Sequence, residues 1–173
     1  KRDALEMQLV AQALDALGIQ SRDRFLRNFT TTLGRRIYTP FEVGSPRGGW
    51  DLWSQVVICV HEHQHVVQHD REGLSFEVSY LADRAARARW EAEAYRSNLE
   101  LHFWRYGTTP SARRLAEVLG DYGCRPEDVD VAAKSLALSA VSIRKGAVIN
   151  EATHVALGWL DEHVPRLRAK GVV

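Results

Sequence analysis

The stretch from residue 51 to residue 71 constrains the fold more than any other part of the chain. Residues 56–60 read Val-Val-Ile-Cys-Val and place apolar side chains on every side of a helix, which is typical of a helix inside a core. Asp51 or Ser54 can serve as its N-cap, and Gly73 offers a C-terminal stop. The sequence therefore predicts one long helix that is buried in the core.

The same helix carries the run His61-Glu62-His63-Gln64-His65, which contains the pattern His-Glu-x-x-His. Positions i and i+4 lie one turn apart on one face, so His61 and His65 can present ring nitrogens to a single metal ion. Glu62 lies about 100° further round the helix, where its carboxylate can reach a water on that metal. Two imidazoles, an open position for water and a carboxylate base are the parts of a zinc hydrolase. The alternative, a solvated helix that is merely rich in histidine, does not fit the apolar residues before it.

A third protein ligand for Zn²⁺ is expected from residues 83–104, a strongly helical stretch without Gly or Pro. It contains Glu91 and Glu93, which lie about 200° apart around a helix, so only one of them can face the site. The face of Glu93 carries charged residues at i,i+3 and i,i+4 spacing, as on a solvated surface: Arg89, Arg96 and Glu100. The face of Glu91 carries small and mildly polar residues: Ala88, Ala94, Tyr95, Asn98 and His102. This periodicity favours Glu91 as the ligand over Glu93.

These residues resemble the gluzincin branch of zinc metallopeptidases, over roughly residues 50–105. Its signature is His-Glu-x-x-His on one helix and a Glu on a following helix, often as Glu-x-x-Ala or Glu-x-x-Ser. Residues 91–95, Glu-Ala-Glu-Ala-Tyr, match the second element. The resemblance implies that His61, His65 and Glu91 bind zinc and that Glu62 is the general base. Four further residues are similar to small, poorly characterised metallopeptidases with His-Glu-x-x-His-x-x-Gln: Gln68, Gly73, Phe76 and Tyr80.

Some residues depart from known patterns. Tyr95 stands where many gluzincins have an Asp that braces a histidine ligand, so the bracing partner is not identified. A metzincin would need a Gly and a third His further along, in the spacing His-Glu-x-x-His-x-x-Gly-x-x-His. This chain has Gln68 and His69 in that stretch instead, which disfavours that family. His69 would lie about 12 Å along the helix axis from His61 and cannot share one metal with it. A second metal held by His65 and His69 stays open, and His63 points to the far side of the helix.

Composition fits one compact domain over residues 1–173, with the active-site core at about 50–105. The chain has 173 residues, of which 45% are hydrophobic and 26% charged. Its formal charge of +1 gives no bias toward nucleic acid or acidic membranes. Cys59 and Cys124 lack CxxC spacing, so we expect two reduced cysteines. No apolar run approaches about 18 residues, and the first residues do not form a signal peptide; both observations favour the cytoplasm. The chain begins without Met, so processing or truncation could have removed a targeting segment.

The remaining sequence reads mostly as helices, so the predicted fold is mainly α with a small β element (α+β), a minimal zincin-like domain. An apolar stripe near the N-terminus indicates a first helix: Ala4, Leu5, Leu9, Ala13, Leu14 and Leu17. Further helices are expected over 111–119, 126–144 and 150–164, the last capped by Asn150. The strand candidate is 30–43, where two short β-prone runs flank Gly34.

The expected activity is hydrolysis of peptides or proteins by a metalloendopeptidase, and hydrolysis of a non-peptide amide is a further possibility. Three residues are candidates for stabilising the tetrahedral oxyanion: Tyr80, Tyr95 and His154. Asn150-Glu151 is a rival source of the third ligand. An extended peptide could dock along residues 30–43, with Tyr38, Phe41 and Trp53 shaping an apolar pocket.

The alternative from another class is a non-catalytic, zinc-stabilised module for assembly or partner binding, which would not need Glu62. DNA binding by a helix-turn-helix near residues 111–144 is disfavoured, because acidic residues stand where a recognition helix would meet DNA: Glu127, Asp128 and Asp130. No nucleic-acid or membrane partner is expected, and the oligomeric state stays open.

Overall fold

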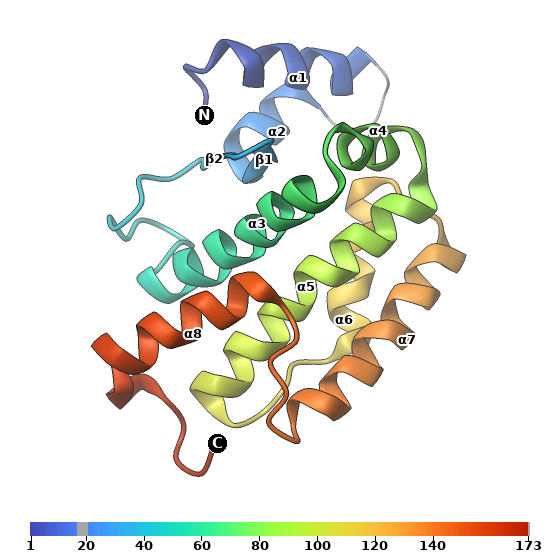
Figure 1. Cartoon of the computed structure of the whole chain (residues 1–173). Coiled ribbons are helices and arrows are strands. Elements are labelled where there is room, and N and C mark those ends of the chain that lie inside the picture. The colour runs from blue at the N-terminus through green and yellow to red at the C-terminus, as the bar shows by residue number, and fades with distance from the viewer. Residues whose placement is uncertain (17–20, 173) are drawn as a thin grey trace.

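A computed structural model describes residues 1–16 and 21–172 of the chain. It is mainly α-helical with one two-stranded antiparallel sheet, which confirms the predicted fold class. Two long helices cross the middle of the molecule side by side, α3 (Leu52–Glu72) and α5 (Arg84–Tyr106) (Figure 1). The other elements cover this pair and thereby decide which of its side chains lose contact with water.

Local capping explains where the two central helices begin and end. The Asp51 carboxylate accepts a hydrogen bond from the Ser54 backbone N–H at 2.8 Å, and α3 stops at Gly73. Gly73 has a φ of 61°, a conformation that costs glycine little, and this turn leads directly into α4 (Leu74–Ala82). Asp83 then caps α5 by accepting from the Ala85 N–H at 2.9 Å. The predicted ends of the helix over 51–71 are confirmed within one residue.

Helices pack against α5 on two sides and create two apolar clusters. On one side lie α6 (Ala112–Glu117), the short helix η1 (Val118–Tyr122) and α7 (Pro126–Ile143). The largest fully buried side chains of this cluster are Leu99, Leu119, Leu136 and Ile143. On the other side α8 (Glu151–His163), followed by the short helix η2 (Pro165–Leu167), contacts α3 and α5. There Val60, Leu101, Trp104 and Leu160 are buried together.

The N-terminal part forms a separate layer over α3. It consists of α1 (Leu5–Ala16), α2 (Arg22–Asn28), β1 (Thr31–Leu33) and β2 (Arg36–Tyr38). The two strands pair antiparallel, with Thr32 opposite Ile37, and both strands contact α3. Both strands lie within residues 30–43, the segment that the sequence predicts for them. This layer covers α3 along the part of the helix that carries the polar residues within 61–68, and so shields them from water.

Several finer predictions are wrong. Among the described side chains of α1, Met7 and Ala11 are buried, whereas Leu5 and Leu9 of the predicted stripe are exposed. The side chains of Ala13 and Leu14, and all of Leu17, fall outside the described part of the chain. The short helices α2 and α4 were not predicted, because neither is long enough to show a clear apolar period. In both regions the packing of neighbours, rather than local periodicity, selects the buried face.

Burial along α3 and α5 also differs from the predicted pattern. Residues 56–59 are only half-buried, and the polar run that follows them is the more buried part of α3. On α5 the expected solvated ladder is absent among the described residues, because Glu100 is buried and accepts hydrogen bonds from the Ile149 and Asn150 N–H groups. A buried carboxylate is tolerated there because it satisfies the N–H groups at the start of α8.

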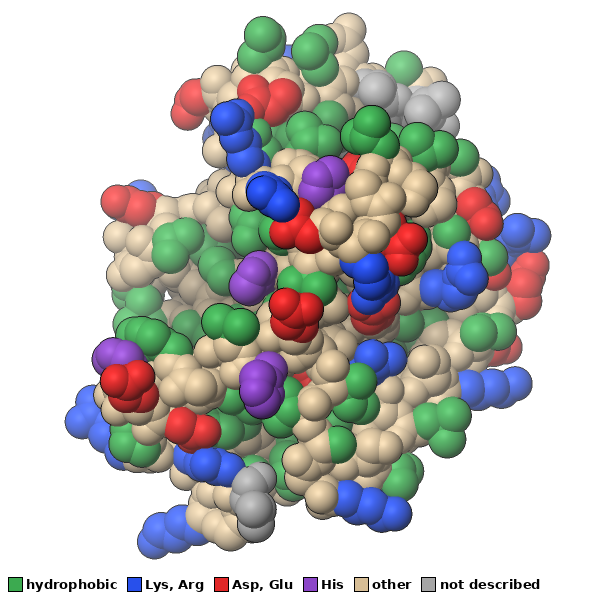
Figure 2. Space-filling view, in the orientation of Figure 1, with side chains coloured by type: hydrophobic (Ala, Val, Ile, Leu, Met, Phe, Trp, Pro, Cys, Tyr) green, Lys and Arg blue, Asp and Glu red, His purple; other side chains and the backbone are tan. Residues whose placement is uncertain are grey.

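The surface carries both charge signs. On the face shown in Figure 2, Lys and Arg side chains are interspersed with Asp and Glu, in line with the formal charge of +1. Hydrophobic side chains are visible over α1 and α4, where the exposed apolar residues include Leu5, Leu9, Leu74 and Val78. In the described residues, none of the helices has the length and apolar character that a membrane span requires.

Candidate metal centre

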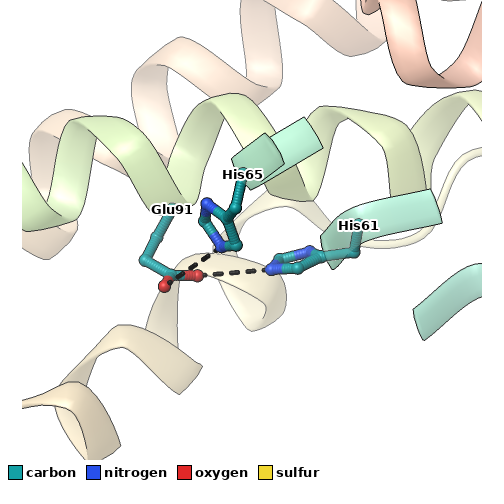
Figure 3. A group of neighbouring side chains, drawn as sticks. All are labelled: His61, His65 and Glu91. Carbon is teal, nitrogen blue, oxygen red and sulfur yellow. Dashed lines mark ion pairs between the residues drawn. The ribbon is translucent and has the colours of Figure 1, made fainter. Parts of the chain in front are cut away.

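His61 and His65 of α3 and Glu91 of α5 point toward one another in the core (Figure 3). Nε2 of His61 lies 3.4 Å from Oε2 of Glu91, and Nε2 of His65 lies 3.6 Å from Oε1 of the same carboxylate. All three residues are buried, with 8%, 6% and 1% of their surface exposed. The helix spacing thus brings the two histidines to one face, and the packing of α5 on α3 brings the carboxylate to them.

The donor set fits a zinc ion. Bond lengths of about 2.0–2.2 Å place neighbouring donors of a tetrahedral site roughly 3.3–3.5 Å apart. Each histidine Nε2 lies near this distance from one oxygen of Glu91, and one donor atom from each residue lies within 4.8 Å of the others. Oε2 of Glu91 is fully buried and accepts no hydrogen bond of normal geometry from the described residues. Such a carboxylate oxygen is costly unless a cation compensates it. Within the described part of the chain, no other group of three His, Cys, Asp or Glu side chains lies close enough to share an ion.

Each histidine is braced through its other ring nitrogen. Nδ1 of His65 lies 2.7 Å from Oε1 of Gln68, whose amide nitrogen donates to the Trp90 backbone oxygen at 3.0 Å. Nδ1 of His61 lies 3.1 Å from Oδ1 of Asn98. Because these amide oxygens accept, Nδ1 of each neutral ring carries the proton, which leaves the lone pair of Nε2 for a metal. The two amides therefore restrain the orientation of both imidazole rings.

Tyr80 holds the carboxylate. Its hydroxyl donates a hydrogen bond to Oε1 of Glu91, and burial raises the pKa of Tyr80 well above its ordinary value, so the phenol stays a donor. Arg87 keeps Tyr80 in place, because its guanidinium donates to the backbone oxygens of Tyr80, Leu81 and Tyr122. These bonds fasten the end of α4 to α5. Tyr80 is therefore beside the centre, as expected, but its proton is committed to Glu91.

Charge interactions among His61, His65 and Glu91 favour an ionised Glu91 beside a protonated imidazole when no metal is bound. Burial acts to raise the pKa of Glu91, but the charge of His65 and the nearby, charged ring of His61 outweigh it and lower this pKa to about 2. Burial acts to lower the pKa of His61, and Glu91 more than compensates, so this pKa is raised. A divalent cation would replace the proton on the histidines.

Glu62 lies beside the centre without belonging to it. Its side chain is 8% exposed, and Oε2 accepts a hydrogen bond from Oγ1 of Thr32 in β1 at 2.8 Å. Glu62, both histidines and Glu91 line one cavity of about 200 Å³ between α3, α4 and the N-terminal layer. The Glu62 carboxylate therefore faces the same cavity as the three side chains of the candidate centre.

Most of the cavity lining is apolar, but it is not the lining that the sequence predicts. Residues 30–33 border the cavity, as expected for the strand segment. The apolar walls consist of Met7, Val10, Phe25, Phe29, Phe76 and Leu81. Tyr38, Phe41 and Trp53 are not among the lining residues, so that prediction is wrong. The Tyr38 hydroxyl bonds Glu6, Phe41 packs on Trp50, and Trp53 stacks on Trp104.

Other candidates from the sequence lie elsewhere. His154 is exposed and lines a different cavity, with Glu100 and Trp104. The buried Asn150 side chain donates to the Glu93 backbone oxygen and to Ser97, and Glu151 is exposed, so this pair supplies no third ligand.

The other histidines of α3 and the remaining candidates near it have partners of their own. Nδ1 of His69 lies 2.6 Å from Oε1 of Glu77. His63 is half-buried and does not belong to the group of His61, His65 and Glu91. Tyr95 packs edge-on against His61, with ring centroids 4.7 Å apart, and is buried outside the cavity lining. Glu93 is held by Arg71 and Gln64. None of these side chains adds a ligand to the centre.

No protein-family model matches this sequence, and no curated protein or solved structure matches it. The function has to be inferred from the residues and their geometry. Three residues near the centre had no assigned role in the sequence: Gln68, Asn98 and Thr32. The first two carry a helical signal, since Gln68 follows His65 by three positions and Asn98 shares the face of Glu91. Thr32 carries no such signal.

Proposed function

We propose that this protein is a zinc-dependent hydrolase, with peptides as its substrates, in which His61, His65 and Glu91 hold the metal and Glu62 is the general base. The observation that carries the proposal is the convergence of two braced imidazoles and one buried carboxylate on a cavity that Glu62 also faces. Structural zinc sites are closed by four protein ligands, whereas catalytic sites use three and leave a position open. A group of three, beside a cavity, fits the second kind.

Bound zinc would supply an electrophilic centre that polarises a substrate carbonyl and makes a water acidic near neutral pH. Glu62 then accepts a proton from the attacking water and passes it to the leaving amine, because its carboxylate faces the cavity. Tyr80 keeps Glu91 oriented through its hydroxyl, so that both histidines meet the same carboxylate. The apolar walls exclude water from the reacting groups and favour a substrate with bulky apolar side chains next to the scissile bond.

The burial of the three ligands also suits a second function, a zinc-stabilised module that assembles with a partner and catalyses nothing. Glu62→Gln separates the two. The variant keeps the size and hydrogen-bonding capacity of the side chain but cannot take a proton, so the hydrolase should keep its zinc and fold and lose cleavage of a peptide library. His63→Gln, on the same helix and outside the group, is the matched control and should cut like the parent. Parental cleavage by Glu62→Gln would contradict the hydrolase.

A further inference from the structure

A threonine 30 positions earlier in the chain contacts the proposed base. Oγ1 of Thr32 lies 2.8 Å from Oε2 of Glu62 and 3.1 Å from the Glu62 backbone oxygen. β1 brings it there, because the pairing of Thr32 with Ile37 fixes the strand and the strand contacts α3. We propose that the Thr32 hydroxyl positions the carboxylate of Glu62 for proton transfer, an inference that rests on the proposed hydrolase.

The contact gives the two oxygens of the Glu62 carboxylate different roles. A hydroxyl has one proton to give, and an ionised oxygen is a stronger acceptor than a backbone carbonyl, so Thr32 donates to Oε2 while Glu62 is charged. Oε1 accepts no hydrogen bond from the residues that the structure describes, and the Glu62 side chain lines the cavity. With Oε2 engaged, Oε1 is the oxygen left to take the proton of the attacking water and deliver it to the leaving amine.

The second acceptor lets the same hydroxyl serve both protonation states. Once Glu62 has taken a proton, it is neutral, and its hydrogen bond with Thr32 weakens. The Glu62 backbone oxygen, 3.1 Å from Oγ1, is then within reach after rotation of the hydroxyl alone. Thr32 therefore keeps a partner through the reaction without any shift of β1 against α3. The arrangement restrains the carboxylate when it is charged and releases it when it must hand the proton on.

Thr32 could instead have only a structural role, which would be to attach the hairpin of β1 and β2 to α3. Three variants distinguish this role from the positioning of Glu62. Thr32→Val replaces the hydroxyl by a methyl of similar size, Thr32→Ser keeps the hydroxyl, and Thr39→Val removes a comparable hydroxyl that bonds the Phe41 backbone oxygen away from the cavity. Cleavage of a peptide mixture is followed at saturating and limiting substrate. Since a positioned proton-transfer group is worth roughly 10²–10⁴-fold, Thr32→Val should lower kcat by about 10-fold or more and leave KM and zinc content unchanged.

Thr32→Ser should restore kcat to near the parental value, and Thr39→Val should match the parent. A parental kcat for Thr32→Val, or an equal loss of kcat for Thr32→Ser, overturns the positioning role and leaves the hydrolase standing. A parent that cuts no peptide in the mixture overturns both proposals.

A measurement that needs no activity tests the contact itself. The Tm values of Thr32→Val, Glu62→Ala and the double variant are compared with that of the parent. If the two side chains share a hydrogen bond, the double variant loses less Tm than the sum of the two single losses. Strictly additive losses of Tm overturn the contact and with it the proposal.

Discussion

Gln68 joins His65 on α3 to the backbone of α5: its side-chain oxygen lies 2.7 Å from Nδ1 of His65, and its nitrogen donates to the Trp90 oxygen at 3.0 Å. Gln68 is fully buried, so water cannot replace either bond. One side chain thus sets both the tautomer of His65 and its distance from Glu91.

Gln68→Leu should therefore weaken zinc binding by about 10- to 100-fold, the range expected when a partner behind a metal ligand is lost. Competition with a chelator of known affinity measures this directly. Gln12→Leu, an exposed glutamine on α1, is the control and should bind zinc like the parent. If Gln68→Leu binds zinc as tightly as the parent, the contact between Gln68 and His65 does not affect metal binding.

Glu91 and Glu93 differ sharply in their contacts, although they are only two positions apart. Glu91→Ala should abolish the binding of about one equivalent of zinc, because it removes a direct ligand. Glu93→Ala should keep the zinc and lower Tm, because it breaks the contacts with Arg71 and Gln64. Metal analysis of the two purified variants decides between them. Loss of zinc from Glu93→Ala alone would show that the ligand assignment is reversed.

The metal-free protein should be most stable between pH 4.5 and pH 6.5. The lowered pKa of Glu91 stabilises the fold above its unfolded value of 4.5, and this contribution is lost as pH falls toward about 2. The raised pKa of His61 stabilises the fold below its unfolded value of 6.5, and this contribution is lost as pH rises through the folded value. Thermal unfolding after dialysis against a chelator measures the profile.

Glu91→Gln is the control for that profile, because it removes one titrating group and also the charge that raises the pKa of His61. The stability of this variant should depend less on pH. Added zinc should restore stability most strongly above pH 6.5, where fewer protons compete for the histidines. A metal-free parent that melts at its highest temperature near pH 9 would contradict the assigned directions of the two pKa values.

The rim of the cavity offers a test of substrate preference. Leu81 of α4 is 59% exposed and lines the cavity, whereas Leu74 of the same helix is 77% exposed and does not. Leu81→Glu should lower kcat/KM for peptides with bulky apolar side chains by roughly 5- to 100-fold, because one apolar contact is worth about 1–3 kcal/mol. Leu74→Glu should leave it unchanged. Equal effects of the two variants would place the substrate outside this cavity.

Local sequence rules predict the parts of the centre that lie on single helices. The ends of α3 follow from Asp51 and Gly73, whose capping and turn preferences act within a few residues. The spacing of His61 and His65 places them on one face whatever surrounds the helix. The same helical period separates Glu91 from Glu93, and the described structure bears out that separation: Glu91 faces the histidines and Glu93 faces Arg71.

Only the tertiary structure decides what surrounds those ligands. Thr32 reaches Glu62 across 30 residues, and Asn98 reaches His61 across 37, through contacts that no local period encodes. The cavity walls come from α1, α2 and β1, whose packing faces depend on which neighbours cover them, so Leu5 and Leu9 are exposed where periodicity predicts burial. Capping and helical spacing are properties of neighbouring residues, whereas a cavity is a property of packed elements, and this difference separates what the sequence alone determined from what folding decided.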